Sequence, residues 1–501
     1  MKSKLSALFK KEYLILYVII LLGSFLRLQG VLTNSFAFTY DVGRDMLALR
    51  NIYYLHKIPL IGQTTGLPGV FYGPWWYYIL TPFFILFSGN PQGIAFVMAL
   101  MGIFSIILGF LLGNKIGGNF LGLIIATLIS ISYSMISLSA QIWNPNIIPL
   151  FIILVLLVLN KLYSSGKNIQ VRYYFLLGLL LTLIMDLEIV FGLFFSIGII
   201  LSAILIINKK ISVRSVGAFI LGGLVVLLPR IIFELRHQFL MTKSFIAFLG
   251  GGNSAHSFCG LLNILANRLG IFFDQFNSTL VPNNKILGYF IVVFIFFSLT
   301  LFYRKTNSTI KNYIKTSLIV IGVFLVGTVF FSHDIWPHYL VGLPVFYILL
   351  FSISLYFLGS AVITRAISVF IILVIIIINL NSVNFFQSFT TPLWEGNAAV
   401  YRNQLAVIDY VYSQAKGNNF KYVAYTPPVY DYTYQYLFLW YGPLKYQYSA
   451  SVKSDLAYFV LEPDLENQNR LTTWLMQRKG DGKIIKSKTV KGGIIVQTRI
   501  H

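Results

Sequence analysis

The sequence predicts a polytopic membrane protein, mainly α-helical, with about eleven transmembrane helices and a small α/β domain at its C-terminal end. Three observations carry this prediction. Hydrophobic residues fill 57% of the 501 positions and charged residues only 11%, against about 25% charged in soluble proteins. Long apolar runs recur up to residue 383 and then stop. Basic residues fall in the short loops between these runs, a pattern that sets membrane topology.

The apolar runs have the length that crosses a bilayer. They lie at about 12–30, 92–113, 119–136, 146–161, 173–186, 188–208, 215–233, 286–303, 316–332, 338–358 and 361–383. The first run follows several lysines, as in a signal peptide, but it is long and lacks a small-residue cleavage site. We therefore expect an uncleaved helix.

The segment 75–88 is apolar but short for a span. If it crossed the membrane, the basic loop 161–172 would lie outside. We therefore predict a juxtamembrane or re-entrant helix at the outer interface.

The basic loops predict the orientation of the chain in the membrane. With the predicted spans, every such loop lies inside, and Glu12 is the only acid there. This predicts a multi-pass protein of the cell membrane, with the N-terminus in the cytoplasm and the C-terminal domain outside. The basic residues behind the net charge of +22 are thus explained by membrane topology, and we expect no nucleic-acid partner. The single cysteine, Cys259, excludes an intrachain disulfide and a cysteine metal cluster.

Acidic residues of the membrane part gather on the predicted outer side. They are Asp41, Asp45, Asp186, Glu188, Glu234, Asp274 and Asp334. The positive-inside rule says little about acids. These residues either solvate the outer loops or line an outward-facing polar cavity. We favour the cavity, because ionisable residues in a membrane domain tend to be functional.

Residues 384–501 have a different composition, with eight of the sixteen acids and no long apolar run. We predict strands at 422–426 and 456–461, helices at 430–441 and 470–478, and a hairpin of 484–488 with 494–499. The chain thus divides into a transmembrane domain, 1–383, and an extracytoplasmic α/β domain, 384–501. The first outer loop of the transmembrane domain covers about 31–91.

An aromatic ladder lies in the predicted helix of this domain. Its members are Tyr430, Tyr432, Tyr434, Tyr436, Trp440 and Tyr441. Such rings stack on sugars or pack in a core or interface, and packing is the commoner use. Since the domain lacks a catalytic motif, it covers an active site, binds an acceptor or stabilises the fold.

Asp41 stands in a charged string, Thr39 to Asp45, just after the first span. Apolar residues then recur at helical spacing as far as Lys57, which predicts an amphipathic surface helix. Asp41 is either the N-cap of this helix or a general base close to a lipid head group. Arg44 and Asp45 are either a surface pair of little energetic weight or part of the same site. A carboxylate at Asp41 is also a candidate ligand for a divalent cation.

Three further loops carry candidate substrate-binding residues. Tyr72 belongs to a Gly, Pro and aromatic stretch typical of the membrane interface. Trp143, Asn144 and Asn146 either bind sugar hydroxyls or begin a helix at a proline. Glu188 lies beside Asp186 between two short spans, where two acids are hard to explain by packing.

Cationic and imidazole side chains lie in two later outer segments. Glu234, Arg236 and His237 end the seventh predicted span, and His338 and Tyr339 begin the tenth. Arginine and histidine are the donors that a lipid phosphate requires. We therefore include these five residues among the candidates for substrate binding.

Taken together, these segments resemble the GT-C superfamily of membrane glycosyltransferases. The likeness is strongest to the branch of the protein O-mannosyltransferases and the lipid A aminoarabinose transferase, glycosyltransferase family 39. The matching pieces are Tyr40–Asp45, Tyr72–Tyr77, Trp143–Asn146, Phe233–His237, and His338–Leu340 followed by Pro344. The long first outer loop and the C-terminal outer domain fit as well.

The resemblance implies an inverting transfer of a sugar from a polyprenyl-phosphate carrier to an acceptor hydroxyl on a lipid, glycan or protein. Asp41 would be the catalytic base, with Arg44 orienting it. Family members often carry a second acid where this chain has Asn144 and Asn146, which weakens a two-acid metal site and leaves Glu188 or Asp45 as substitutes. No cofactor is certain, and a divalent cation remains a candidate.

Two other function classes fit parts of the sequence. A flippase or transporter of polyprenyl-linked sugars also needs phosphate contacts, but it needs polar groups along the whole path, whereas the acids here cluster at one face. A non-catalytic assembly subunit would use the C-terminal domain for binding. Convergence of Asp41, Glu188, Glu234 and His338 on one site would favour the enzyme.

Overall fold

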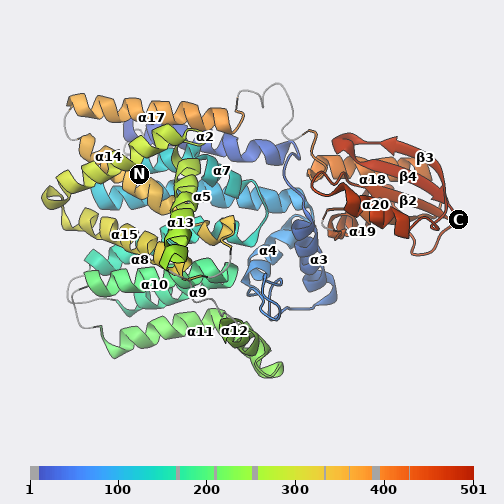
Figure 1. Cartoon of the computed structure of the whole chain (residues 1–501), viewed down its shortest axis with the longest axis horizontal. Helices are drawn as coiled ribbons and strands as arrows, with labels where there is room; N and C mark the ends of the chain where they lie inside the picture. Colours follow the sequence, from blue (N-terminus) through green and yellow to red (C-terminus); the bar gives the residue numbers. More distant parts are fainter. Residues whose placement is uncertain are drawn as a thin grey trace, which may run out of the picture.

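The structure, a computed structural model, describes residues 11–164, 170–207, 211–250, 258–331, 334–359, 362–385, 395–427 and 429–501. A bundle of long helices makes up most of the molecule, and a small domain with a β-sheet lies beyond one end of it (Figure 1). Helices α3, Tyr40–Leu55, and α4, Trp75–Leu86, lie between the two parts. We call this end of the bundle the α3 end.

The described helices confirm the predicted membrane fold. Nine helical segments are long and apolar enough to cross a bilayer. The α-helices in them are α2 Lys11–Leu32, α5 Pro91–Gly117, α8 Ile148–Ser164, α10 Ile189–Ile206, α11 Val213–Arg236, α14 Lys285–Phe302, α15 Ser308–Val329, α16 Leu343–Leu358 and α17 Val362–Ser382. Short 3-10 turns, η1 Asn144–Ile147 and η3 Pro337–Leu340, precede α8 and α16.

Two more predicted runs are helical, but no single helix in either run is as long as the nine spanning segments. The run 119–136 is α6, Asn119–Ile131, followed by α7, Tyr133–Ser139, at an angle of 61°. The run 173–186 is α9, Val171–Leu187, which has only 17 residues.

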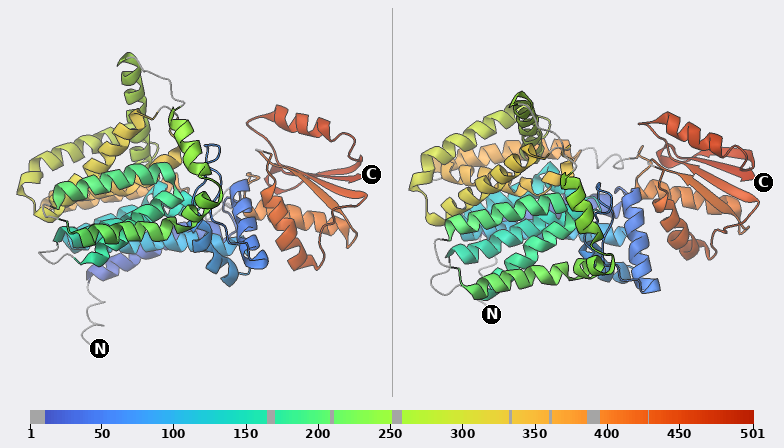
Figure 2. Two further views of the ribbon diagram at one scale, coloured as in Figure 1. Left: turned by 90° about the horizontal axis from the view of Figure 1, so that it is seen from below. Right: turned by 60° about the horizontal axis from the view of Figure 1, so that its bottom comes forward.

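Helices α12, Leu240–Gly250, and α13, Phe258–Leu280, have no counterpart among the predicted spans. Helix α13 runs across the bundle helices, and both views in Figure 2 agree with this (Figures 1 and 2). Its polar residues, among them Arg268, Asp274 and Asn277, interrupt the apolar run that sequence reading relies on.

The break between α6 and α7 is stabilised by a buried arginine of α2. Arg27 donates hydrogen bonds to the carbonyls of Ile129 (2.8 Å) and Ser130 (2.9 Å) and to the Ser139 hydroxyl (3.2 Å). A helix end leaves carbonyls without intrahelical partners, and such groups are costly in an apolar environment. Arg27 therefore supplies the donors that the bend requires.

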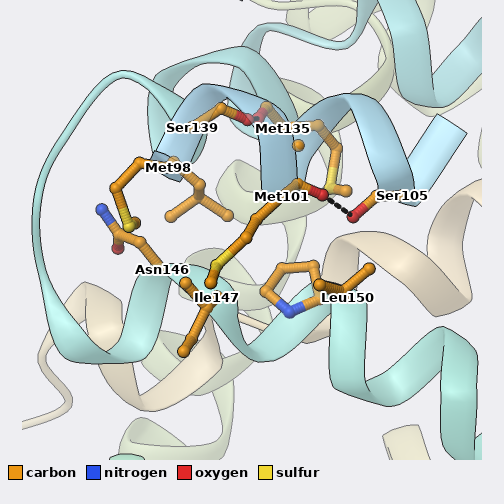
Figure 3. A pocket seen from close by; sticks show the side chains of 11 residues that line it. Met98, Met101, Ser105, Met135, Ser139, Asn146, Ile147 and Leu150 are labelled. Atoms are coloured by element: carbon orange, nitrogen blue, oxygen red, sulfur yellow. Dashed lines mark hydrogen bonds between the residues drawn. The ribbon is translucent and has the colours of Figure 1, made fainter. Parts of the chain in front are cut away.

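A small cavity lies beside this break. Its volume is about 10 Å³, which is close to the space of one water molecule. Side chains of α5, α7, η1 and α8 line it, among them Met98, Met101, Met135 and Ser139 (Figure 3). The cavity is far too small for a lipid or a sugar and is a packing feature of the bundle.

The short apolar segment forms α4, a helix of 12 residues, too short to cross a bilayer. Helix α3 is the predicted amphipathic helix, and it buries Val42, Met46 and Leu49. Both helices lie at the α3 end rather than within the bundle (Figure 1).

The C-terminal domain contains a four-stranded mixed sheet in the order β1-β2-β4-β3. Its strands are β1 Lys421–Tyr425, β2 Leu456–Leu461, β3 Lys483–Thr489 and β4 Ile495–Ile500. Strands β1 and β2 are parallel, and the other neighbours are antiparallel. The helices are α18 Tyr401–Ala415, α19 Tyr432–Tyr446 and α20 Gln468–Gln477. All the elements predicted from sequence are present, and α18 is additional.

Backbone and aromatic hydrogen bonds attach this domain to the α3 end. The Phe38 N–H donates to the Ala399 carbonyl (2.8 Å), and the Tyr401 N–H donates to the Phe36 carbonyl (3.1 Å). From α19, Trp440 Nε1 donates to the Ser88 carbonyl (2.9 Å). The boundary at 383/384 stays a prediction, since 386–394 lie outside the described residues.

Candidate functional site

Four acids of the membrane part lie at the α3 end, and they differ sharply in exposure. The side chain of Asp41 is 26% exposed, whereas those of Asp45, Asp186 and Glu188 are 1%, 0% and 1% exposed. A buried carboxylate needs hydrogen-bond or ionic partners, so the partners of these four acids indicate what each one does.

The stretch Tyr72–Tyr77 supplies donors to all three buried acids. Trp76 Nε1 and the Tyr77 hydroxyl donate to Asp45 (2.8 and 3.2 Å). The Trp75 N–H donates to Asp186 (3.2 Å). The Tyr72 hydroxyl donates to Glu188 (2.9 Å). This stretch, which sequence alone assigned to the membrane interface, therefore holds the acid of α3 together with the two acids at the junction of α9 and α10.

Asp186 is paired with Arg230 from α11. Arg230 Nη2 lies 2.8 Å from Asp186 Oδ1. The Gly73 N–H donates to the Asp186 carbonyl (3.0 Å), and a Cβ on Gly73 would overlap the Asp186 carboxylate. Close approach to this buried ion pair explains the glycine. The pair joins α9, α11 and the loop before α4.

Asp41, Arg44 and Asp45 form a compact ionic group in the first turns of α3. Arg44 Nη1 lies 2.7 Å from Asp41 Oδ1, and Arg44 Nη2 lies 2.9 Å from Asp45 Oδ1. Burial raises the pKa of the Asp45 carboxyl, while Arg44 and the Trp76 indole oppose that rise. Asp41 does not cap α3 through its side chain, because the N-cap residue is Thr39. The partly exposed carboxylate of Asp41 pairs instead with Arg44.

Glu188 brings together three of the other predicted residues. It accepts from Tyr72, and its Oε2 lies 4.0 Å from His338 Nε2. The His338 ring packs edge-on against Trp143, with 5.0 Å between ring centroids. Burial and then the Glu188 carboxylate raise the pKa of Tyr72, with smaller contributions from Tyr339 and Asp41. Asp41 is connected to this group through Arg44, through Asp45 and through the Tyr72–Tyr77 stretch, which donates to both Asp45 and Glu188.

We call Asp41, Tyr72, Trp143, Glu188 and His338 the α3-end cluster. Asn144 lies beside it and donates to the Leu187 carbonyl, next to Glu188 in the chain. Asn146 donates to the Gln141 carbonyl (3.2 Å). Tyr339 packs edge-on against His338, with 4.6 Å between centroids.

Glu234 departs from the expected convergence. Its carboxylate accepts from the N–H groups of Met241 (2.9 Å) and Thr242 (3.0 Å) and from the Thr242 hydroxyl (2.6 Å). These contacts cap the first turn of α12. Its neighbours Arg236 and His237 are exposed at the end of α11, and the His237 ring stacks on Phe233 at 4.1 Å.

The residues do not form a site for a divalent cation at Asp41. In the described ranges, three or more His, Cys, Asp or Glu side chains nowhere come together in a metal-binding arrangement. The partner of Asp41 is the Arg44 guanidinium, which Asp41 shares with Asp45. We therefore derive no chemical step through a metal.

Sequence reasoning counted Arg230 among the cationic groups for a lipid phosphate, whereas the structure pairs it with Asp186; it did not select Arg268. Arg268, on α13, donates to the Thr328 carbonyl (3.2 Å) and the Phe331 carbonyl (3.4 Å) at the end of α15. The Phe331 ring in turn contacts Tyr339 at 6.3 Å. Arg268 thus supports the segment that leads to His338. The only signal in the sequence is an arginine within a partly apolar stretch.

No protein-family model matches the sequence, and no curated protein matches it. Solved structures do match. ArnT from Cupriavidus metallidurans bound to undecaprenyl phosphate is similar over 97% of both chains, with 12% identity and a TM-score of 0.58. The apo state of the same protein matches over 90% of this chain and 97% of that chain, with 11% identity and a TM-score of 0.50.

An oligosaccharyltransferase from Archaeoglobus fulgidus, in complex with Zn and sulfate, matches 88% of this chain and 59% of its own, with 14% identity. Its TM-score of 0.47 is low, and nothing about its metal is carried over. ArnT is a GT-C glycosyltransferase. The chain therefore has the GT-C fold, as the sequence resemblance predicted.

Proposed function

We propose that the protein is a membrane glycosyltransferase that moves a sugar from a polyprenyl-phosphate carrier to an acceptor hydroxyl, with inversion at the anomeric carbon. The observation that carries this proposal is the partly exposed carboxylate of Asp41 at the α3 end, where the acids Asp45, Asp186 and Glu188 are buried, on a GT-C fold. The similar structure of ArnT was solved with undecaprenyl phosphate, which supports a lipid carrier of that class here.

Asp41 acts as the general base in this mechanism. The acceptor oxygen attacks the anomeric carbon in line with the leaving phosphate, and the Asp41 carboxylate takes the hydroxyl proton. The bond from the anomeric carbon to the phosphate oxygen breaks, and its electron pair stays on the phosphate. Arg44, 2.7 Å away, keeps Asp41 in place for this transfer. Asp45 and Asp186 are buried in their own ion pairs and act as scaffold.

The lipid phosphate is bound by cationic and imidazole donors of the later segments. His338 belongs to the α3-end cluster, and Arg236 and His237 are exposed at the end of α11. Donors held on a leaving phosphate stabilise the charge that develops there. Trp143 and Tyr339 border the same region and contact the sugar. Asn144 and Asn146 are buried and donate to backbone carbonyls, so they support this region rather than bind the sugar.

We propose that the α3 end faces the outside of the cell membrane. Lys161 lies in the last turn of α8 and Lys115 in the last turn of α5, each at the far end of its helix from α3. Basic residues mark the cytoplasmic side. The C-terminal domain, which we delimit as 384–501, then lies outside and beside the cluster.

The proposal is tested by measuring transfer from a panel of radiolabelled polyprenyl-phosphate sugars in membranes that hold native acceptors. We expect transfer by the wild type, and a loss of about 100-fold or more for Asp41→Asn, because a general base contributes about 10²–10⁴ in rate. Asp274→Asn is the matched control, since Asp274 belongs to an exposed pair with Lys285.

Equal transfer by wild type and Asp41→Asn would remove Asp41 from the mechanism. Absence of transfer from every donor, in membranes with native acceptors, would contradict the enzyme and favour the flippase or assembly function.

A further inference from the structure

The aromatic ladder divides into two groups in the structure. Tyr434 and Tyr436 are fully buried. Tyr434 donates to Glu462 (2.9 Å), and Tyr436 donates to the Gly89 carbonyl. These rings do the packing that sequence reading favoured. Tyr430 is different, because it is 55% exposed.

The Tyr430 ring contacts two other tyrosine rings. Its ring lies parallel to that of Tyr432, at 4° with 5.8 Å between centroids. It also contacts the Tyr40 ring of α3, at 6.0 Å and 31°. This row of three rings therefore joins the C-terminal domain to the residue that precedes Asp41.

The backbone fixes this row against α3. A Cβ on Gly43 would overlap the backbone of Thr433, so the first turn of α19 lies directly on the first turn of α3. The Thr426 hydroxyl donates to the Tyr430 carbonyl (2.7 Å), which holds the loop before α19. Burial and the Asp41 carboxylate raise the pKa of Tyr40, which is consistent with contact between Tyr40 and Asp41.

Polar groups accompany the rings. Asp431, which stands between Tyr430 and Tyr432 in the sequence, is half-buried. Gln435 Nε2 donates a hydrogen bond to its carboxylate (2.7 Å). Flat apolar faces beside carboxylate and amide groups match the two surfaces of a sugar, which has faces of C–H bonds and edges of hydroxyls.

We propose that Tyr40, Tyr430 and Tyr432 form an acceptor subsite that binds a sugar ring of a carbohydrate acceptor beside Asp41. This rests on the proposed function, which supplies the transfer reaction, and it names the acceptor class as a glycan or a sugar head group. The C-terminal domain then takes part in substrate binding, and α3 carries both the base and one ring of the subsite.

The test compares full-length wild type with Tyr430→Ala and Tyr430→Phe in lipid nanodiscs. Trisaccharides of glucose, mannose and galactose serve as soluble probes, and saturation-transfer NMR measures their binding without any transfer reaction. We expect one or more trisaccharides to bind, Tyr430→Ala to weaken that binding about tenfold, and Tyr430→Phe to restore it, because the ring face rather than the hydroxyl makes the contact.

Tyr54→Ala is the matched control, because Tyr54 lies on the same helix α3 and is 58% exposed. It should bind the probes as the wild type does. With the donor identified above, Tyr430→Ala should also raise the KM for the trisaccharide about tenfold and leave kcat within about twofold.

Two outcomes overturn the subsite: no trisaccharide binds the wild type, or Tyr430→Ala binds as well as the wild type. Trisaccharide binding that depends on Tyr430, with no transfer from any donor, would keep the subsite and refute the proposed transferase. The two proposals therefore fail separately.

Discussion

At the scale of single residues, Asp41 differs from its acidic neighbours because its carboxylate has no donor from the Tyr72–Tyr77 stretch among the described contacts and is less buried. Asp45, Asp186 and Glu188 each have an aromatic or backbone donor from Tyr72–Tyr77 and almost no exposed surface. Asp41 keeps exposed surface and a single arginine partner. Chemistry on an incoming substrate requires an accessible group, and this difference is why we assign the base to Asp41 rather than Glu188.

Gly73 is the residue whose replacement tests this scaffold. In Gly73→Ala the new methyl group overlaps the Asp186 carboxylate and pushes it away from Arg230. We expect the free energy of unfolding to fall by about 1–3 kcal/mol and sugar transfer to decrease. Thermal unfolding of the detergent-solubilised protein measures the first effect. Gly66→Ala is the control, since the space around Gly66 is open; equal losses in both variants would contradict the steric explanation.

Sequence reading selected Asp41 and Glu188 but could not pair the acids correctly. Asp186 and Arg230 are far apart in the chain, and only the packing of α9 against α11 brings them together. Glu234 looked like a cluster member because it lies on the same side, yet a local turn takes its carboxylate to α12. A sequence pattern predicts on which side of the membrane a residue lies, but not where its side chain points.

At the scale of elements, the bend between α6 and α7 depends on Arg27. In Arg27→Met the carbonyls of Ile129 and Ser130 lose their side-chain donor. Unsatisfied buried acceptors cost about 1–3 kcal/mol, so we expect a clear loss of stability. Arg214→Met, at an exposed position of α11, should unfold like the wild type. Denaturant unfolding in detergent measures both, and equal stability of the two variants would show that Arg27 is dispensable.

Hydropathy predicted the long helices well, because eleven apolar runs correspond to helices in the structure. It did not predict α13, where polar residues interrupt the apolar stretch. It also did not predict the bend at Ser132, since neither glycine nor proline marks it. Arg27, whose side chain donates to the carbonyls at the bend, lies about a hundred residues earlier in the chain.

At the scale of the whole molecule, the C-terminal domain is held against the membrane part rather than tethered to it. Gly43→Val would place a branched side chain against the backbone of Thr433. We expect faster hydrogen–deuterium exchange in α19 and reduced transfer, because the domain no longer lies close on α3. Gly396→Val, where the surrounding space is open, should leave exchange in α19 unchanged. Exchange in Gly43→Val equal to that of the wild type would contradict the close contact.

The sequence predicted a sheet domain beside the membrane part but not how the two are joined. The aromatic ladder from Tyr430 to Tyr441 could be read as a sugar platform or as packing, and its buried rings are used for packing. Buried rings attach the domain to the turn at Ser88 and Gly89, while Tyr430 stays exposed. Only the way α19 packs on α3 shows which rings are buried and which remain exposed.

Arg27 also has a consequence for how the protein is made. Its partners at Ile129, Ser130 and Ser139 are 102, 103 and 112 residues further along the chain, and synthesis runs at about 5–20 residues per second. For several seconds α2 carries a charge without its partners, which costs up to about 2.5–3.5 kcal/mol in a bilayer. We expect the first helix to stay at the insertion machinery until α6 and α7 arrive, so that the nascent helices enter the lipid together.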